Sequence, residues 1–238
     1  MQTRTDLTIR RSNERGHAEH GWLDSYHSFS FADYYDPEHM GFRSLRVINE
    51  DRIAPLGGFP THPHRDMEIF SYLVEGELAH MDSMGNEHTI TRGEIQVMSA
   101  GSGVTHSEFN PSPKSTTHML QIWITPKQRD LTPRYTEWRP SGDESNAPKI
   151  LLISADGRDH SAAIAQDAEV WKLQLGAGES TAHTLATGRG AWLQVIRGGV
   201  EIDGERLLPG DALSTESPGT LEFKATTEGL EALLFDLA

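Results

Sequence analysis

The sequence predicts an all-β protein with two similar barrels in one chain. Short stretches of alternating apolar and polar residues, separated by Gly, Pro and Asn turns, run along the whole chain, as is typical of antiparallel sandwiches and barrels. Evidence for helices is thin, and one sequence unit occurs twice, which favours internal duplication of a barrel. Strands are expected at residues 44–48, 68–74, 78–82, 95–99, 118–124, 149–153, 170–175, 191–196, 200–202 and 233–236.

The repeated unit is a strand, a glycine turn, a second strand and a Gly-acid step into a third strand. In the first half residues 72–78 lead to residues 91–95, and in the second half residues 194–200 lead to residues 208–212. Generic hairpin chemistry is the alternative explanation of this likeness. Tight turns are expected at residues 74–77, 84–86 and 197–200.

A polar stretch rich in Arg, Thr, Ser, Asp and Pro separates the two copies and is interpreted as a connection. The expected domains are an N-terminal barrel over residues 1–128, a linker over 129–148 and a C-terminal barrel over 149–238. A chain of 238 residues with 36% hydrophobic residues is large enough to give these barrels a core.

Composition excludes several kinds of chemistry. The chain has no cysteine, so disulfides, zinc–thiolate sites, iron–sulfur clusters and a thiol nucleophile are ruled out, and any metal must be held by His, Asp or Glu. A formal net charge of −14 disfavours direct binding to nucleic acid or to anionic lipid. The N-terminal sequence MQTRTDLTIRRSNERG has no apolar run or cleavage pattern, so we expect a cytoplasmic protein without a membrane segment.

Two short motifs in the first half predict a metal site. His62-Pro63-His64 places two imidazoles two residues apart, and on an extended strand such residues point to the same face. His106-Ser107-Glu108 presents an imidazole and a carboxylate in the same way. If the two strands lie side by side, four N and O donors converge, which suits one divalent transition metal and leaves a position for solvent or substrate.

The spacing of glycines around these motifs resembles the two signatures of the cupin superfamily. The first signature corresponds to Gly57 or Gly58, His62, His64, Glu68 and Gly76; the second corresponds to Gly93, Gly101, Gly103, His106 and Asn110, with Ser99 at the usual proline. The stretches THPHRDMEIFSYLVEGELAHMDSMGN and GEIQVMSAGSGVTHSEFNP resemble the pirin family, whose extended turn is also present here as Gly101-Ser102-Gly103. The segment ERGHAEHGWLDSYHSFSFADYYDP is similar to bacterial pirins described as quercetin dioxygenases.

The resemblance implies two cupin barrels of the double-stranded β-helix or jelly-roll type, with one metal site in the first. Carried over by position, the ligands are His62, His64, His106 and Glu108, the same set that strand alternation gives. In this family Glu68 is not a ligand, which leaves it either beside the ligands or as a structural glutamate at the barrel mouth. The second barrel has lost its metal, and His183 is expected at the surface or the barrel mouth.

The resemblance further implies a dioxygenase that cleaves flavonols such as quercetin with O2 and releases CO. The metal is expected to be Fe(II), with Ni, Co, Mn, Cu or Zn as alternatives. Glu108 is expected to act as ligand and as the base that accepts the 3-hydroxyl proton. Substrate and O2 are the expected partners, and a monomer is expected. The alternatives are another oxygenase substrate, or a pirin-like iron-binding, redox-sensing regulatory protein without an enzymatic substrate.

Several other residues remain open at this point. The N-terminal segment contains His17, His20 and His27 among Trp22, Tyr26, Phe29 and Phe31; it either covers the barrel mouth or packs across the two barrels. His80 and His88 flank a hairpin and are expected to face solvent. His118 and Gln121 are expected near the site, where Gln121 either orients a ligand or packs in the core.

Overall fold

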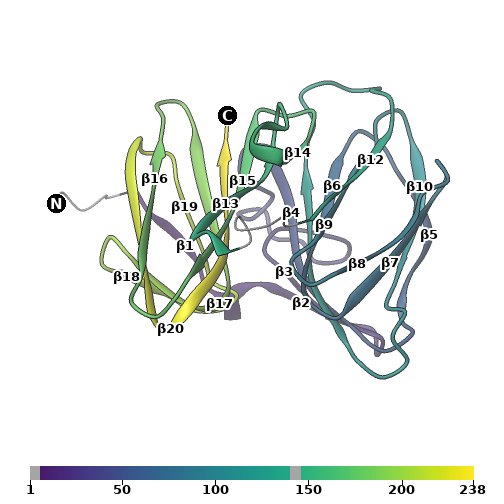
Figure 1. Cartoon of the computed structure of the whole chain (residues 1–238), viewed down its shortest axis with the longest axis horizontal. Helices are drawn as coiled ribbons and strands as arrows, with labels where there is room; N and C mark the ends of the chain where they lie inside the picture. The colour runs from purple at the N-terminus through teal and green to yellow at the C-terminus, as the bar shows by residue number, and fades with distance from the viewer. Residues whose placement is uncertain (1–5, 140–145) are drawn as a thin grey trace. The chain divides into compact units, whose positions relative to one another are not determined.

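The computed structural model describes residues 6–139 and 146–238, which form two compact units. Within the described residues, the N-terminal unit takes 15–139 and 164–166, and the C-terminal unit takes 6–14, 146–163 and 167–238. The first strand of the chain therefore belongs to the C-terminal unit. Each unit is built mainly from antiparallel strands, which confirms the predicted all-β class (Figure 1).

The N-terminal unit consists of two sheets. The larger has the strand order β12 (Arg134–Trp138), β9 (Ile95–Ser99), β6 (Glu68–Glu75), β11 (Thr117–Ile124), β4 (Leu45–Ile53), β3 (Leu23–His27) and β2 (Gly16–Glu19). The smaller has the order β5 (Gly58–His64), β10 (Val104–Phe109), β7 (Glu77–Asp82) and β8 (Glu87–Thr91).

Apolar side chains from both sheets meet in the core of this unit. Leu73 of β6 and Met119 of β11 pack in one cluster with Leu78 of β7 and Ile90 of β8, and all four are fully buried. Burial of such side chains is the main favourable contribution to folding. The two sheets therefore face each other as the walls of one barrel, with the inward positions of each strand alternating with outward ones.

The C-terminal unit has one sheet with the order β1 (Thr8–Arg10), β19 (Ala212–Thr215), β17 (Gly190–Ile202), β20 (Gly219–Leu237), β15 (Ala168–Leu175), β13 (Lys149–Ser154) and β14 (Ala162–Ala163). Strand β16 (Ser180–Leu185) pairs with β20, and β18 (Glu205–Leu207) pairs with β17. Short 3-10 turns occupy Ser12–Glu14 and Arg158–His160. Strands β15, β16, β17 and β20 share one buried core, to which they contribute Leu173, Leu185, Leu193, Phe223 and Leu234.

All ten expected strands overlap observed strands. The turn expected at residues 197–200 is wrong, because β17 runs through it with β-bulges on either side of Gly198. Gly198 has a φ of 69°, and a Cβ there would lie 2.1 Å from the Gly229 carbonyl oxygen of β20, so glycine is needed for the two strands to bend together.

The stretch 129–148, expected as a linker, contains β12, which pairs with β9 in the N-terminal unit. Residues 140–145 of that stretch lie outside the described residues. Across the described residues, helices long and apolar enough to cross a membrane are absent.

Candidate metal centre

Strands β5 and β10 lie side by side and bring three histidines together. In the antiparallel register His106 is opposite His62 and Val104 is opposite His64. The ring centroids are 4.5 Å apart for His62 and His106, 4.7 Å for His62 and His64, and 4.8 Å for His64 and His106. Nε2 of His106 lies 3.1 Å from Nε2 of His62. The convergence predicted from strand alternation is therefore present for the three imidazoles.

Two of these imidazoles, those of His64 and His106, are held in the neutral form that can bind a metal. Burial, together with the neighbouring imidazoles His106 and His62, lowers the pKa of His64 to about 4. Burial and the neighbours His62 and His80 lower the pKa of His106 to about 3. Nδ1 of His62 lies 2.8 Å from the Pro60 carbonyl oxygen, which can only accept a hydrogen bond. His62 therefore donates from Nδ1, which leaves Nε2, the atom that faces His106, as its candidate ligand atom.

Glu108, also buried, accepts hydrogen bonds from a row of polar side chains on the opposite sheet. Gln121, Ser71 and Gln96 stand in register on β11, β6 and β9. Nε2 of Gln121 donates to Oε2 of Glu108 at 2.6 Å, while Nε2 of Gln96 and Oγ of Ser71 donate to Oε1 at 2.5 and 3.0 Å. Gln121 thus orients Glu108, which is one of the two roles that the sequence suggests for Gln121. Glu108 forms a second potential metal-binding group with His106 and His80, so its carboxylate borders the imidazole cluster.

A cavity of about 690 Å³ lies beside the imidazoles, and its wall includes His62, His64, Glu108 and Gln121. Trp123 packs edge-on against His64, with ring centroids 4.8 Å apart. Aromatic residues of the N-terminal segment complete the wall, which favours the interpretation that this segment covers the barrel mouth. The wall residues from that segment are His17, His20, Trp22, His27 and Phe31.

His80 and its neighbour Asp82 lie behind the cluster and were missed as site residues by sequence reasoning. The expectation that His80 faces solvent is wrong: its side chain is 1% exposed, because on β7 it alternates with outward residues and lies opposite Glu108 of β10. Its partner across the hairpin, His88, does face outward, with a side chain 45% exposed. A signal was available in the sequence, because His80 and Asp82 have the same spacing of two as the other motifs, with the outward residue Met81 between them.

Two other expected neighbours of the site point elsewhere. Glu68 is buried and accepts a hydrogen bond from Oγ of Ser99 at 2.6 Å, and burial raises its pKa. His118 bonds through Nε2 to Oε1 of Glu50 at 2.9 Å. His118 is an odd number of positions from Gln121 on the same strand, so it faces away from the cavity.

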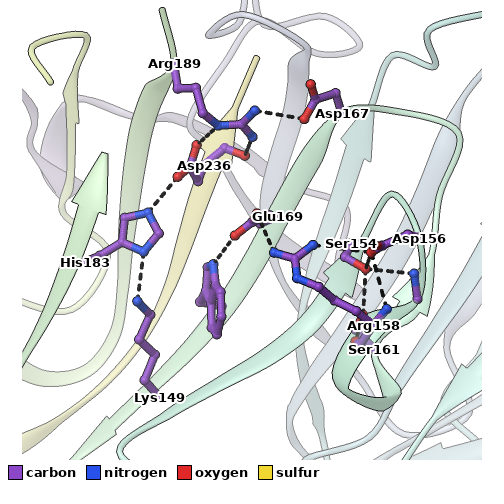
Figure 2. A network of polar contacts seen from close by, with 12 residues as sticks. Lys149, Ser154, Asp156, Arg158, Ser161, Asp167, Glu169, His183, Arg189 and Asp236 are labelled. Atoms are coloured by element: carbon purple, nitrogen blue, oxygen red, sulfur yellow. Dashed lines mark hydrogen bonds and ion pairs between the residues drawn. The ribbon is translucent and has the colours of Figure 1, made fainter. Parts of the chain in front are cut away.

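The C-terminal unit contains a buried histidine in a very different setting (Figure 2). His183 is 6% exposed, so the expectation of a surface position is wrong, and the barrel-mouth alternative stays a prediction. Its Nε2 bonds to Oδ2 of Asp236 at 2.7 Å and its Nδ1 to Nζ of Lys149 at 2.8 Å. Arg189 donates to both Asp236 and Asp167. Within residues 6–139 and 146–238, both groups that could hold a metal lie in the N-terminal unit.

The chain folds into two barrels, and the first contains a cluster of imidazoles that the second does not share. These features define a two-barrel cupin protein. Residues 8–124 match the family described as Pirin, and residues 151–237 match the Quercetinase C-terminal cupin domain. The chain belongs to the pirin family.

Known relatives share nearly the full length of the chain. It is 47% identical over 231 residues to a protein of Escherichia coli (strain K12) named quercetin 2,3-dioxygenase, covering 97% of this chain and 98% of that protein. It is 42% identical over 226 residues to the pirin-like protein of Caulobacter vibrioides, covering 94% and 96%. The crystal structure of the bacterial pirin YhhW from Escherichia coli in complex with nickel(II) superposes with a TM-score of 0.92, at 46% identity and with 97% and 98% coverage.

Proposed function

We propose that the protein is a metal-dependent dioxygenase that cleaves flavonols such as quercetin with O2 and releases CO. The observation that carries this proposal is that His62 and His64, two of the three clustered imidazoles, line an aromatic-walled cavity of about 690 Å³. Drug-sized aromatic ligands occupy cavities of a few hundred to about 1,000 Å³ with mostly apolar walls and a few polar groups. The names of the bacterial relatives support the same activity.

The residues present fit a divalent transition metal. His62, His64 and His106 would hold it, with Glu108 as a fourth ligand, and this N and O set accepts Fe, Mn, Co, Ni, Cu or Zn. The nickel complex of YhhW supports a divalent metal, and Fe(II) is our proposal for the metal in the cell. When bound, the metal would supply Lewis acidity and an electron path between the flavonol and O2.

The side chains of the chain itself bind, orient and deprotonate the substrate in this proposal. Trp123 and Phe31 pack edge-on with ring centroids 5.4 Å apart and offer faces and edges to a flat ring system. Oε2 of Glu108 accepts one hydrogen bond, from Gln121, and so keeps a lone pair for the proton of the substrate 3-hydroxyl. Gln96 and Ser71 bind the other oxygen and fix the carboxylate plane.

The direct test adds quercetin and air to protein loaded separately with Fe, Mn, Co, Ni and Cu. Loss of flavonol absorbance together with CO release is expected for at least one metal. No turnover with any of them would overturn the dioxygenase assignment and leave a metal-binding regulatory protein.

A variant tests the role of Glu108 as base. Glu108→Gln keeps the size of the side chain but cannot accept a proton, so we expect turnover to fall by about 10²–10⁴-fold. Metal content is measured on the same samples. Full activity at full metal occupancy would refute the assignment, and activity lost only in proportion to metal would make Glu108 a ligand without a base role.

A further inference from the structure

A buried histidine–aspartate pair lies directly behind the candidate metal cluster. His80 and Asp82 stand on β7, opposite Glu108 and His106 of β10. Their side chains are 1% and 0% exposed. Burying two such polar groups is costly unless both are hydrogen-bonded, and His80 lies between Asp82 and His106, with one ring nitrogen toward each.

The hydrogen-bond directions can be followed from Asp82. Its carboxylate accepts hydrogen bonds from the backbone N–H of Met84 at 2.8 Å and from the backbone and side chain of Asn86. Burial alone would raise the pKa of Asp82, but the bonds from Asn86 and His80 outweigh it and hold the pKa below its usual value. An ionised carboxylate only accepts hydrogen bonds, so Nε2 of His80, 3.2 Å from Oδ2, carries the proton.

The position of the His80 proton determines which kind of contact His80 can make with His106. With its proton on Nε2, His80 can accept a hydrogen bond at Nδ1, which lies 3.4 Å from Nδ1 of His106. A His106 that uses Nε2 as its ligand atom carries its proton on Nδ1, and Nδ1 of His80 is the acceptor placed to receive that proton. Nε2 of His106 is then the unprotonated atom, and it is the atom that faces His62.

We propose that His80 and Asp82 are positioning residues that fix the tautomer and orientation of His106, so that its Nε2 lone pair is directed into the imidazole cluster. The proposal rests on the proposed function in one respect, that His106 is a metal ligand. Ligand histidines commonly donate their second N–H to an outer partner, and loss of that partner typically weakens metal binding by about 10–100-fold. Here the outer partner is a second histidine.

Tyr135 of β12 connects this pair to Glu108. Its ring stacks on His80, with centroids 4.7 Å apart and planes at 27°. Its hydroxyl has one proton, for which Oε1 of Glu137 at 3.2 Å and Oε1 of Gln96 at 3.3 Å are both acceptors, and Nε2 of Gln96 donates to Glu108. One set of contacts behind the cluster therefore orients both His106 and Glu108.

The first test reads the tautomers in metal-free protein. In nitrogen NMR spectra of ¹⁵N-histidine-labelled protein, His80 should carry its proton on Nε2 and His106 on Nδ1, with assignments taken from His80→Leu and His106→Gln. A proton on Nε2 of His106, or an even mixture of its tautomers, would overturn the proposal. This measurement does not depend on metal binding or activity, so it separates failure of the positioning role from failure of the proposed function.

The second test measures nickel(II) affinity by chelator competition in folded variants. His80→Leu should weaken nickel binding by about 10–100-fold. His80→Asn should recover part of the loss, because its amide oxygen can accept the Nδ1 proton of His106. The matched control is His88→Leu, across the same hairpin, since His88 also stacks on Tyr135 but its side chain is 45% exposed. Affinity in His80→Leu equal to that of His88→Leu would overturn the positioning role, and absence of nickel binding by the wild type would instead count against the proposed function.

Discussion

The two barrels each bury a histidine, but they use its ring nitrogens in opposite ways. His106 in the first barrel is 2% exposed and presents Nε2 to another imidazole beside a cavity. His183 in the second barrel is 6% exposed and has both ring nitrogens bonded, to Lys149 and to Asp236. This comparison shows that a buried histidine is a candidate metal ligand only where one ring nitrogen keeps a lone pair that no other group uses.

The internal repeat shows where this difference arises. When the two copies are aligned with Tyr72 on Gln194, Ile69 of the first copy corresponds to Ala191 of the second. In the sheets, Ile69 is the register partner of Trp123, and Ala191 is the register partner of Asp236. Trp123 and Asp236 therefore occupy equivalent positions in the two barrels. Trp123 packs against His64 without bonding its nitrogens, whereas Asp236 bonds His183 and Arg189. The residue at this one position is therefore part of an aromatic cavity wall in the first barrel and part of an ion-pair network in the second (Figure 2).

The largest expected effect is the difference in metal binding between two single variants, one with alanine for a histidine of the first barrel and one with alanine for the histidine of the second. His64→Ala removes one of three converging imidazoles and should lower nickel(II) affinity and flavonol cleavage by more than about 100-fold. His183→Ala should leave both unchanged per folded molecule. Chelator competition and activity assays on the two purified variants check this, and a loss of nickel affinity in His183→Ala comparable to that in His64→Ala would remove the contrast between the barrels.

In the second barrel, a substitution in the buried network should lower the free energy of unfolding rather than metal binding. Asp236→Asn leaves the guanidinium of Arg189 and the ring of His183 without their carboxylate partner, and the cost of breaking such a buried pair is about 3 kcal/mol in unfolding free energy. Denaturant unfolding measures it. Lys149→Met, which removes a half-buried partner of His183, is the milder control. Equal stability of Asp236→Asn and wild type would contradict a structural role for the network.

Strand alternation in the sequence predicts four converging donors, and the structure brings the three imidazoles together. His62, His64, His106 and Glu108 came from spacings of two within strands, and the structure has those strands side by side. The same rule failed at His80, because a polar residue near a hairpin was assigned to solvent although β7 lies between β10 and β8.

His183 was misplaced for a different reason. Its partner Asp236 is 53 residues away in sequence, and such long-range pairing leaves no local pattern. The lone histidine on an alternating strand therefore gave no indication of the carboxylate that it meets in the folded barrel.

Gln96 illustrates a further limit of sequence reasoning. It is a polar residue within the apolar strand Ile95–Ser99, which marks it as unusual, but its contact with Glu108 depends on how two sheets face each other. Local alternation gives the face of a residue and not its partner on the opposite sheet.

The smallest expected effect concerns two buried aspartates whose pKa values move in opposite directions. Burial, reinforced by Glu108 and opposed by a bond from Ser25, raises the pKa of Asp51 in the first barrel to about 7. Burial would also raise the pKa of Asp236, but bonds from His183 and Arg189 lower it. The folded state therefore binds the Asp51 proton more tightly than the unfolded chain does, and the contribution of Asp51 to stability is lost as pH rises from about 4 to 7. The contribution of Asp236 to stability is lost only as pH falls below about 4.

Asp51→Asn isolates this effect in metal-free protein. Because one pKa unit is worth about 1.4 kcal/mol, the stability of the wild type relative to Asp51→Asn should fall by about 2 kcal/mol between pH 5 and pH 7. Denaturant unfolding at several pH values gives the difference curve, in which the other titrating groups cancel. The same curve for Asp236→Asn should be flat over this range. A flat curve for Asp51→Asn as well would mean that the cavity barrel holds no protonated carboxyl, and the two aspartates would no longer distinguish the barrels.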